Sequence, residues 1–241
     1  MFYSLSYNYW CFMIPALVLT MIAQWYVNSA YKRWSQQPNA RGITGAEAAQ
    51  QLIRNTGLND VVAGSGSGRG LQLRQIAGNL TDNYNPRSKT LSLSPAVAQG
   101  TSVASLAIAA HELGHAQQDA EGYLPLRLRG ALVPAVSIGS YLGWILIMAG
   151  LLLNLTDLAW VGLLVFSGGA LFALLTLPVE LDASARARRM LTDSGLIIES
   201  RERQGVKTVL NAAALTYVAA LATAIMQLLY FASLIGGRRR R

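Results

Sequence analysis

Four long uncharged stretches separate the polar regions of the chain. They cover about residues 9–27, 130–153, 158–177 and 208–235. A bilayer core about 30 Å thick needs roughly 20 apolar residues at a rise of about 1.5 Å each, so every stretch is long enough to cross it as a helix. The second and third stretches are joined by only a few residues, which predicts a membrane hairpin. The fourth is richer in Ala, Thr and Asn, which indicates partial packing against protein.

The pattern changes between the first and second apolar stretches. Thr44 and Glu47 have capping-box spacing ahead of an amphipathic pattern, and they predict a helix over about residues 45–56. A phosphate-binding loop has Lys-Ser or Lys-Thr directly after its glycines, and the Gly- and Ser-rich stretch at 64–70 has neither. It is therefore expected to be a flexible turn.

Two short segments further along alternate apolar and polar residues at period two. Residues 71–76 and 89–94 follow this pattern and predict short strands. Ser94-Pro95 is a helix-start signal, and Thr101 offers a second start after a glycine. The second start predicts a helix over about residues 101–120.

Composition and charge agree with a membrane protein. Hydrophobic residues make up 52% of the 241 residues, and the formal net charge is +8. The basic residues gather beside the apolar stretches, which is typical of membrane anchoring and argues against a nucleic-acid partner. The lone cysteine, Cys11, excludes a disulfide within the chain.

Orientation is predicted by the positions of Lys and Arg. With the amino terminus outside, eleven basic residues flank the membrane on the cytoplasmic side: Lys32, Arg33, Arg41, Arg127, Arg129, Arg186, Arg188, Arg189, Arg201, Arg203 and Lys207. The positive-inside rule then places the soluble region in the cytoplasm. The four arginines at 238–241 oppose this assignment if all four stretches cross. A fourth stretch that re-enters or lies in the interface would remove the conflict.

Both histidines of the chain lie in the predicted helix. His111 and His115 are four residues apart and flank Glu112. At this spacing two imidazoles emerge one turn apart and can reach one ion at about 2 Å. A metal-bound water has a lowered pKa, and a neighbouring carboxylate can take its proton, which is the chemistry of HExxH hydrolases. Gly114 indicates that another part of the chain approaches the helix backbone. The alternative is a surface helix with ordinary polar residues.

A third zinc ligand is expected to be a carboxylate, because catalytic zinc usually has three protein ligands and no histidine remains. Asp119 lies too far along a straight helix, and Asp157 lies at the hairpin tip, across the membrane. Glu180 follows the hairpin directly. Because the two ends of a hairpin return to the same side, Glu180 can meet the histidine pair. Asp182 is the nearest rival, although orienting a histidine suits it better.

Three segments resemble a known family. "AAHELGHAQQDA", "DNYNPRSKTLSLSP" and "LPVELDAS" are similar to those of the membrane-bound neutral zinc metallopeptidases, the YugP-like family. The resemblance covers most of the chain. It implies His111 and His115 as zinc ligands, Glu112 as general base and Glu180 as the downstream ligand. HtpX-like membrane gluzincins likewise have a hairpin between the motif and the glutamate. Many gluzincins have an aspartate where this chain has Ser184, so the residues orienting the histidines stay open.

The resemblance also gives the predicted strand at 89–94 a role, because zincins commonly bind extended peptide along an edge strand near the active-site helix. The residues expected to pair with substrate are Thr90, Leu91, Ser92 and Leu93. A plain structural strand is the alternative. Tyr84 and Tyr123 are the phenols nearest the motif and are better explained as packing residues than as oxyanion donors. Glu199 and Glu202 lie among arginines and are expected to form salt bridges at the surface.

Together these observations predict a mainly α integral membrane protein with about four transmembrane helices and a zincin-like catalytic domain of helices plus a small β-sheet. The predicted division is an anchor at 1–30, a catalytic region at 31–129, a hairpin at 130–179, the third-ligand helix at 180–207, and a last apolar segment with a basic tail at 208–241. The protein is expected in the plasma membrane with its catalytic face in the cytoplasm.

The predicted function is hydrolysis of peptide bonds in a protein or peptide substrate with one Zn²⁺ per chain. The lipid bilayer is the other expected partner, and nucleic acid is not. A catalytically silent membrane adaptor with a structural zinc is the main alternative. Hydrolysis of a non-peptide amide or a lipid-linked substrate is an alternative within the enzymes.

Overall fold

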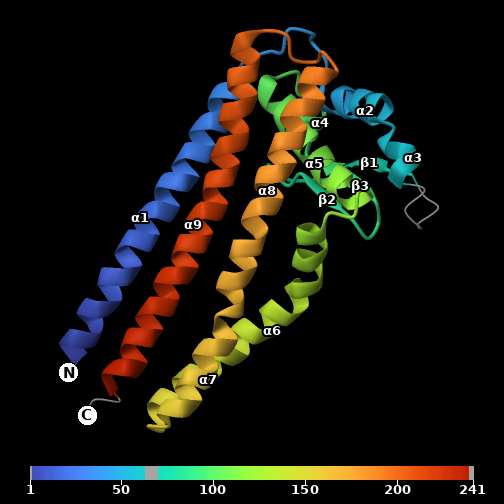
Figure 1. The fold of residues 1–241 in the computed structure, drawn as a ribbon. Coiled ribbons are helices and arrows are strands. Elements are labelled where there is room, and N and C mark those ends of the chain that lie inside the picture. Colours follow the sequence, from blue (N-terminus) through green and yellow to red (C-terminus); the bar gives the residue numbers. More distant parts are fainter. Residues whose placement is uncertain (1, 63–69, 239–241) are drawn as a thin grey trace. The chain divides into compact units, whose positions relative to one another are not determined.

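The computed structural model describes residues 2–62 and 70–238. The described chain is mainly helical, with four long apolar helices and a small three-stranded sheet, as predicted (Figure 1). The expected Gly- and Ser-rich turn lies almost entirely outside the described residues.

The chain forms two compact units. The first, the apolar unit, comprises Met1–Trp25, Leu128–Pro178 and Leu215–Arg241. The second, the mixed unit, comprises Tyr26–Arg127 and Val179–Ala214. Both histidines and the predicted third ligand belong to the mixed unit.

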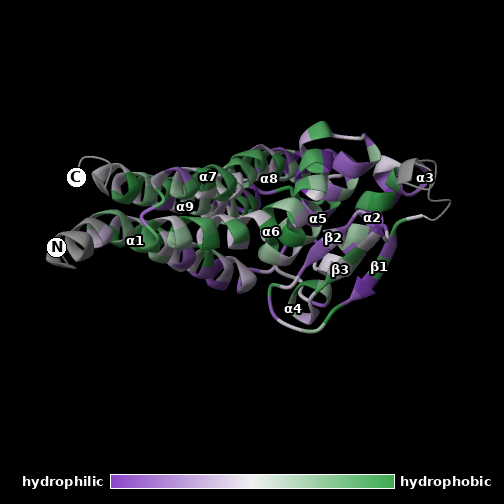
Figure 2. Cartoon of the chain, turned by 90° about the horizontal axis from the view of Figure 1, so that it is seen from below, coloured by the Kyte–Doolittle hydropathy of each residue, from purple (hydrophilic) through white to green (hydrophobic). Residues whose placement is uncertain are grey.

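The long helices match the four apolar stretches. Their bounds are α1 (Phe2–Ser35), α6 (Leu124–Leu152), α7 (Thr156–Phe166), α8 (Gly168–Asp193) and α9 (Ser200–Arg238). The third stretch is interrupted at Ser167, between α7 and α8, and α8 continues well beyond the predicted end of that stretch. Four helical spans, with α7 and α8 counted as one, are long and apolar enough to cross a membrane. Figure 2 shows hydrophobic residues along these helices.

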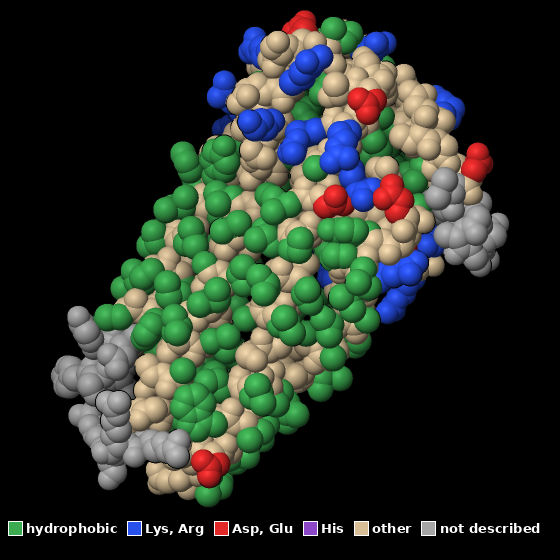
Figure 3. Space-filling model, in the orientation of Figure 1, with side chains coloured by type: hydrophobic (Ala, Val, Ile, Leu, Met, Phe, Trp, Pro, Cys, Tyr) green, Lys and Arg blue, Asp and Glu red, His purple; other side chains and the backbone are tan. Residues whose placement is uncertain are grey.

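Large apolar side chains are exposed on the apolar unit. Ile138, Tyr141 and Leu164 have exposed fractions of 69%, 77% and 74%. Figure 3 shows hydrophobic side chains covering the visible face of the long helices. Such a continuous apolar surface is unfavourable in water, whereas helices that satisfy their own backbone hydrogen bonds are stable in lipid.

The hairpin of α6 and α7 packs through small residues. A Cβ on Gly150 would lie 2.5 Å from the backbone nitrogen of Ala159, so the two backbones are in contact there. Ile147, Leu151 and Leu163 form a buried cluster beside this contact. Close approach of small residues is how membrane helices gain packing energy without a hydrophobic driving force.

In the mixed unit, α2 (Gly45–Thr56) confirms the helix predicted at 45–56. The Thr44 hydroxyl accepts from the Glu47 backbone, and the Glu47 carboxylate accepts from the Thr44 backbone, which completes the capping box. The buried face of α2, which includes Ala48, Ala49 and Leu52, packs against the helix that carries the histidines. A short helix, α3 (Leu58–Val62), follows.

The sheet confirms both predicted strands and adds a third. Its strands are β1 (Gln72–Gln75), β2 (Asn83–Asn85) and β3 (Thr90–Leu93), in the order β1-β3-β2. β1 is parallel to β3 and β2 is antiparallel to it. β2 was not predicted, because a segment of only three residues is too short for its alternation to distinguish a strand from a loop.

The position of β3 corrects the expected substrate-binding strand. β3 is buried at the centre of the sheet, and its backbone faces a neighbouring strand on each side. A central strand has no free edge for an extended peptide. The expectation that Thr90, Leu91, Ser92 and Leu93 pair with substrate along a free strand edge therefore does not fit the position of β3, which agrees with the alternative of a structural strand.

The helix predicted at 101–120 is confirmed as α5 (Val103–Ala120), which follows the short helix α4 (Pro95–Ala98). α5 begins after Ser102, whose hydroxyl accepts from the Ser105 backbone nitrogen. α2, α3, α4, β2 and β3 all pack against α5. Most of α5 is buried, so the histidine motif lies on the central helix of the mixed unit.

Glu202 was expected to form a salt bridge at the surface, but the structure shows a different environment. Its side chain is buried, and its carboxylate accepts from the backbone nitrogens of Ala40, Ile198 and Glu199. A carboxylate in the first turn of α9 satisfies amides that have no partner within the helix. This contact also ties the start of α9 to the loop after α1.

Candidate active site

The two histidines lie on one face of α5, as their spacing predicts. Their ring centroids are 4.9 Å apart and the ring planes are nearly perpendicular. His115 is buried and His111 is half-buried. Because α5 is surrounded by the rest of the mixed unit, both imidazoles have little freedom to move away from this arrangement.

α8 reaches the histidines because Gly114 has no side chain. A Cβ at Gly114 would lie 2.5 Å from the carbonyl oxygen of Ala183 and 3.1 Å from its Cα, so α5 and α8 are in contact backbone to backbone. The close approach inferred from the sequence is therefore present. Glu180 lies on α8 one turn before Ala183, which places its carboxylate at the histidine face of α5.

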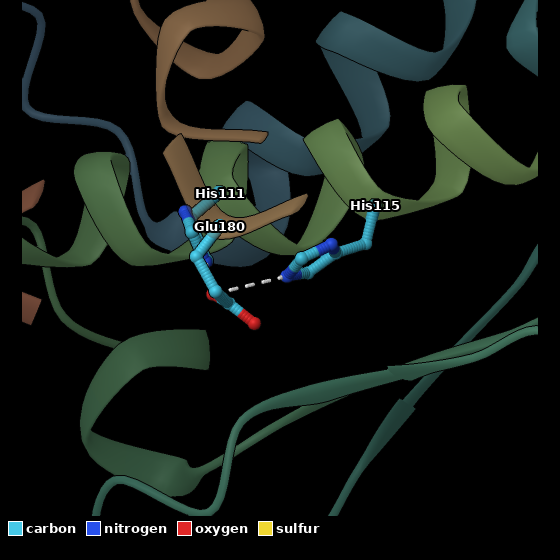
Figure 4. Close-up of side chains that lie close together, drawn as sticks. All are labelled: His111, His115 and Glu180. Atoms are coloured by element: carbon cyan, nitrogen blue, oxygen red, sulfur yellow. Dashed lines mark hydrogen bonds and ion pairs between the residues drawn. The ribbon is translucent and has the colours of Figure 1, made fainter. Parts of the chain in front are cut away.

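The Glu180 side chain is 3% exposed. One of its oxygens, Oε2, lies 3.2 Å from His111 Nε2 and 3.5 Å from His115 Nε2. One ligand atom of each residue lies within 4.8 Å of the others. Figure 4 shows the three side chains converging, with a dashed line between Glu180 and His115.

This arrangement fits zinc. Atoms bound about 2.0–2.1 Å from a tetrahedral zinc lie about 3.3 Å from one another, close to the two distances from Glu180 to the histidines. Two imidazole nitrogens and one carboxylate oxygen are also a common ligand set of catalytic zinc, with a fourth position left for water or substrate. His111, His115 and Glu180 together therefore suggest a zinc centre.

The other ring nitrogen of each histidine has a partner. The Ser184 hydroxyl lies 3.2 Å from His111 Nδ1, so Ser184 stands where it can orient that ring. His115 Nδ1 lies 3.0 Å from the side-chain oxygen of Gln118. Gln118 was not singled out from the sequence, although it lies three residues after His115 on the same helix.

Asp182 bonds to neither ring. Its carboxylate accepts from Gln118 Nε2 and from Arg186 Nε. Asp182 also does not belong to the His-His-Glu cluster. Asp182 is therefore linked to His115 through Gln118.

Negative charge is concentrated at the cluster. Burial alone disfavours the charged imidazolium of His115, but the carboxylates of Glu180 and Glu112 and the Gln118 amide outweigh burial and raise the pKa of His115. The same carboxylates favour a bound cation. Glu112 is half-buried, and among the described residues its carboxylate forms no hydrogen bond or ion pair.

The two tyrosines near the motif are engaged elsewhere. The Tyr84 hydroxyl donates to Asp119 at 2.6 Å, and Lys89 donates to the same carboxylate oxygen at 2.7 Å. Burial and the Asp119 carboxylate raise the pKa of Tyr84. The Tyr123 ring packs under the Arg186 guanidinium. These contacts agree with packing roles for both phenols.

The proteins that this chain resembles are consistent with a zinc site. A helix-borne HExxH motif is typical of zinc metallopeptidases. Residues 9–236 match the family described as "Putative neutral zinc metallopeptidase". The "Putative membrane protease YugP" of Bacillus subtilis (strain 168) is 38% identical over 218 residues, which are 90% of this chain and 92% of the relative. No solved structure matches the chain. The chain belongs to this family of neutral zinc metallopeptidases.

Gly114→Ala is expected to separate α5 from α8. The added methyl group meets backbone that cannot rotate away, so overpacking should cost about 1–3 kcal/mol, against about 1 kcal/mol gained in helix propensity. Zinc affinity should fall as Glu180 is displaced. The matched control is Gly130→Ala, because nothing lies within 4 Å of a Cβ there. Thermal unfolding and zinc titration of both variants check this, and equal zinc affinity would contradict it.

Proposed function

We propose that this protein is a membrane-bound zinc peptidase that hydrolyses peptide bonds. The observation that carries the proposal is the convergence of His111, His115 and Glu180 on one face of α5, next to Glu112. Membership of a zinc metallopeptidase family and 38% identity to a protein named as a membrane protease support it.

In this proposal His111, His115 and Glu180 hold one Zn²⁺ per chain. When bound, zinc polarises the scissile carbonyl and lowers the pKa of water. The Glu112 carboxylate accepts a proton from the attacking water and passes it to the nitrogen of the leaving amine. Ser184 and Gln118 hold the two rings through Nδ1, which leaves both Nε2 atoms toward Glu180.

We expect an extended peptide substrate to pair with β2. β2 is an edge strand that packs against α5, and its Tyr84 side chain reaches Asp119 one turn beyond His115. An edge strand offers unpaired backbone groups to a peptide. The partners proposed are therefore a protein or peptide substrate and the lipid bilayer.

We place the protein in the plasma membrane with the mixed unit in the cytoplasm. The four helical spans support membrane insertion. The eleven Lys and Arg residues near the predicted inner ends of these spans support the orientation.

Glu112→Gln tests the chemistry. The amide cannot accept a proton from water, so we expect peptide hydrolysis to fall at least about a hundredfold while zinc stays bound. Turnover of a fluorescence-quenched peptide library and zinc content of the purified full-length chain are the measurements. Glu199→Gln, an exposed acid at the start of α9, is the control. A zinc-containing Glu112→Gln chain that retains full cellular function would instead support the adaptor.

Glu180→Gln tests the third ligand. A neutral amide is a poorer zinc ligand than a carboxylate, so the zinc dissociation constant should rise by more than about a hundredfold. Chelator competition on the full-length chain measures it, again with Glu199→Gln as control. Unchanged affinity here, combined with zinc loss in Asp182→Asn, would transfer the ligand role to Asp182.

Cysteine labelling tests the orientation. With Cys11→Ser as background, Arg54→Cys places a thiol on the exposed side of α2 and Asp157→Cys places one at the hairpin tip. In intact cells a membrane-impermeant maleimide should label Asp157→Cys and leave Arg54→Cys unlabelled until lysis. Labelling of Arg54→Cys in intact cells would refute the cytoplasmic assignment.

A further inference from the structure

Gln118 is a polar residue of α5 whose side chain faces α8 and is fully buried, with an exposed fraction of 0%. Its Nε2 donates to the Val179 carbonyl oxygen at 2.8 Å and to Asp182 Oδ2 at 2.9 Å. Its Oε1 lies 3.0 Å from His115 Nδ1. Buried amides are retained at such positions when each polar atom has a partner, as here.

These contacts determine the tautomer of His115. A backbone carbonyl and a carboxylate can only accept, so the Gln118 NH₂ group must face them and its oxygen must face His115. An amide oxygen also only accepts, so His115 Nδ1 must carry the hydrogen. In the neutral ring, the Nε2 lone pair then points toward Glu180 Oε2, as a zinc ligand requires.

The orientation of the Gln118 amide is itself held from α8. Asp182 accepts from Arg186 Nε as well as from Gln118, and Arg186 Nη1 donates to Glu121 at 2.6 Å. Val179, the other acceptor, directly precedes Glu180 in the chain. One amide group therefore contacts a ligand histidine on α5 and the backbone next to the ligand glutamate on α8.

We propose that Gln118 is a positioning residue of the zinc site, which presents His115 in the Nδ1–H tautomer and keeps Glu180 in register with it. This inference rests on the proposed function. Gln118 does not touch the substrate or the reacting water, and it acts through His115 and Val179. Neighbouring side chains of this kind typically change metal affinity by about 10- to 100-fold when they are removed.

The test compares Gln118→Met with Gln117→Met in the full-length chain in detergent micelles. Gln117 precedes Gln118 on α5, is partly exposed and donates to Glu121. Its substitution removes the same kind of side chain without affecting a contact of His115. Gln118→Met should raise the zinc dissociation constant by about 10- to 100-fold. Gln117→Met should leave it unchanged. Chelator competition, carried out well below the melting temperature of each variant, measures the zinc dissociation constant.

The tautomer itself separates positioning from packing. In the zinc-free wild type, at a pH where the His115 ring is neutral, the hydrogen should lie on Nδ1, because Gln118 Oε1 can only accept. Gln118→Met removes that acceptor and should shift His115 toward the tautomer with its hydrogen on Nε2, whereas Gln117→Met should not. Nitrogen NMR chemical shifts of the two histidines report which ring nitrogen carries the hydrogen.

The outcomes distinguish this inference from the proposed function. If the wild-type chain binds zinc and Gln118→Met and Gln117→Met have the same zinc dissociation constant, the positioning role alone is overturned. A fall in melting temperature at unchanged zinc affinity would do the same. If Gln118→Met does not fold, a zinc-free wild-type chain whose neutral His115 carries its hydrogen on Nε2 overturns the role. A wild-type chain that binds no zinc would overturn the proposed function and this inference together.

Discussion

The site depends on the backbone contact between α5 and α8. At Gly114 the two helices approach so closely that a single methyl group would clash with the carbonyl oxygen of Ala183. Helix pairs with ordinary side chains at the crossing have axes about 8–10 Å apart. Without the glycine, the side chains of Glu180 and His115 would have to span a wider gap. The contact places Glu180 on a rigid helix rather than on a loop, and side chains on rigid elements hold a precise geometry better than side chains on loops.

The buried Glu180 carboxylate defines what the site needs. A buried carboxylate is costly unless positive charge or donors compensate it. Gln118 requires the hydrogen of His115 on Nδ1, so His115 Nε2 faces Glu180 Oε2 as a second acceptor when the ring is neutral. Two acceptors facing each other repel, and either a proton on His115 Nε2 or a cation between His115 Nε2 and Glu180 Oε2 removes that repulsion. The raised pKa of His115 and the proposed zinc site are thus two consequences of the same concentration of negative charge.

Local patterns predicted the local features of the site, and little more. The i,i+4 spacing of the histidines and the capping box at Thr44 depend on neighbours within one or two turns, and both are present. Glu180 could be inferred because a hairpin of two long apolar stretches constrains where its two ends lie. Strand order has no comparable local signal, so β3 could not be recognised as central. The hydrogen bonds of Gln118 and Glu202 join segments distant in the chain, and only the folded structure reveals them.

The connectivity also links the site to the long apolar helices. The chain leaves the mixed unit at Arg127 and re-enters it at Val179, so α6, α7 and the first part of α8 lie between His115 and Glu180 in sequence. The histidine pair forms within one helix, but Glu180 joins it only when that intervening segment has folded back. Two histidines alone are an incomplete ligand set for catalytic zinc. Under the proposed function, a chain whose hairpin has not formed therefore lacks a complete active site, which confines hydrolysis to the assembled protein.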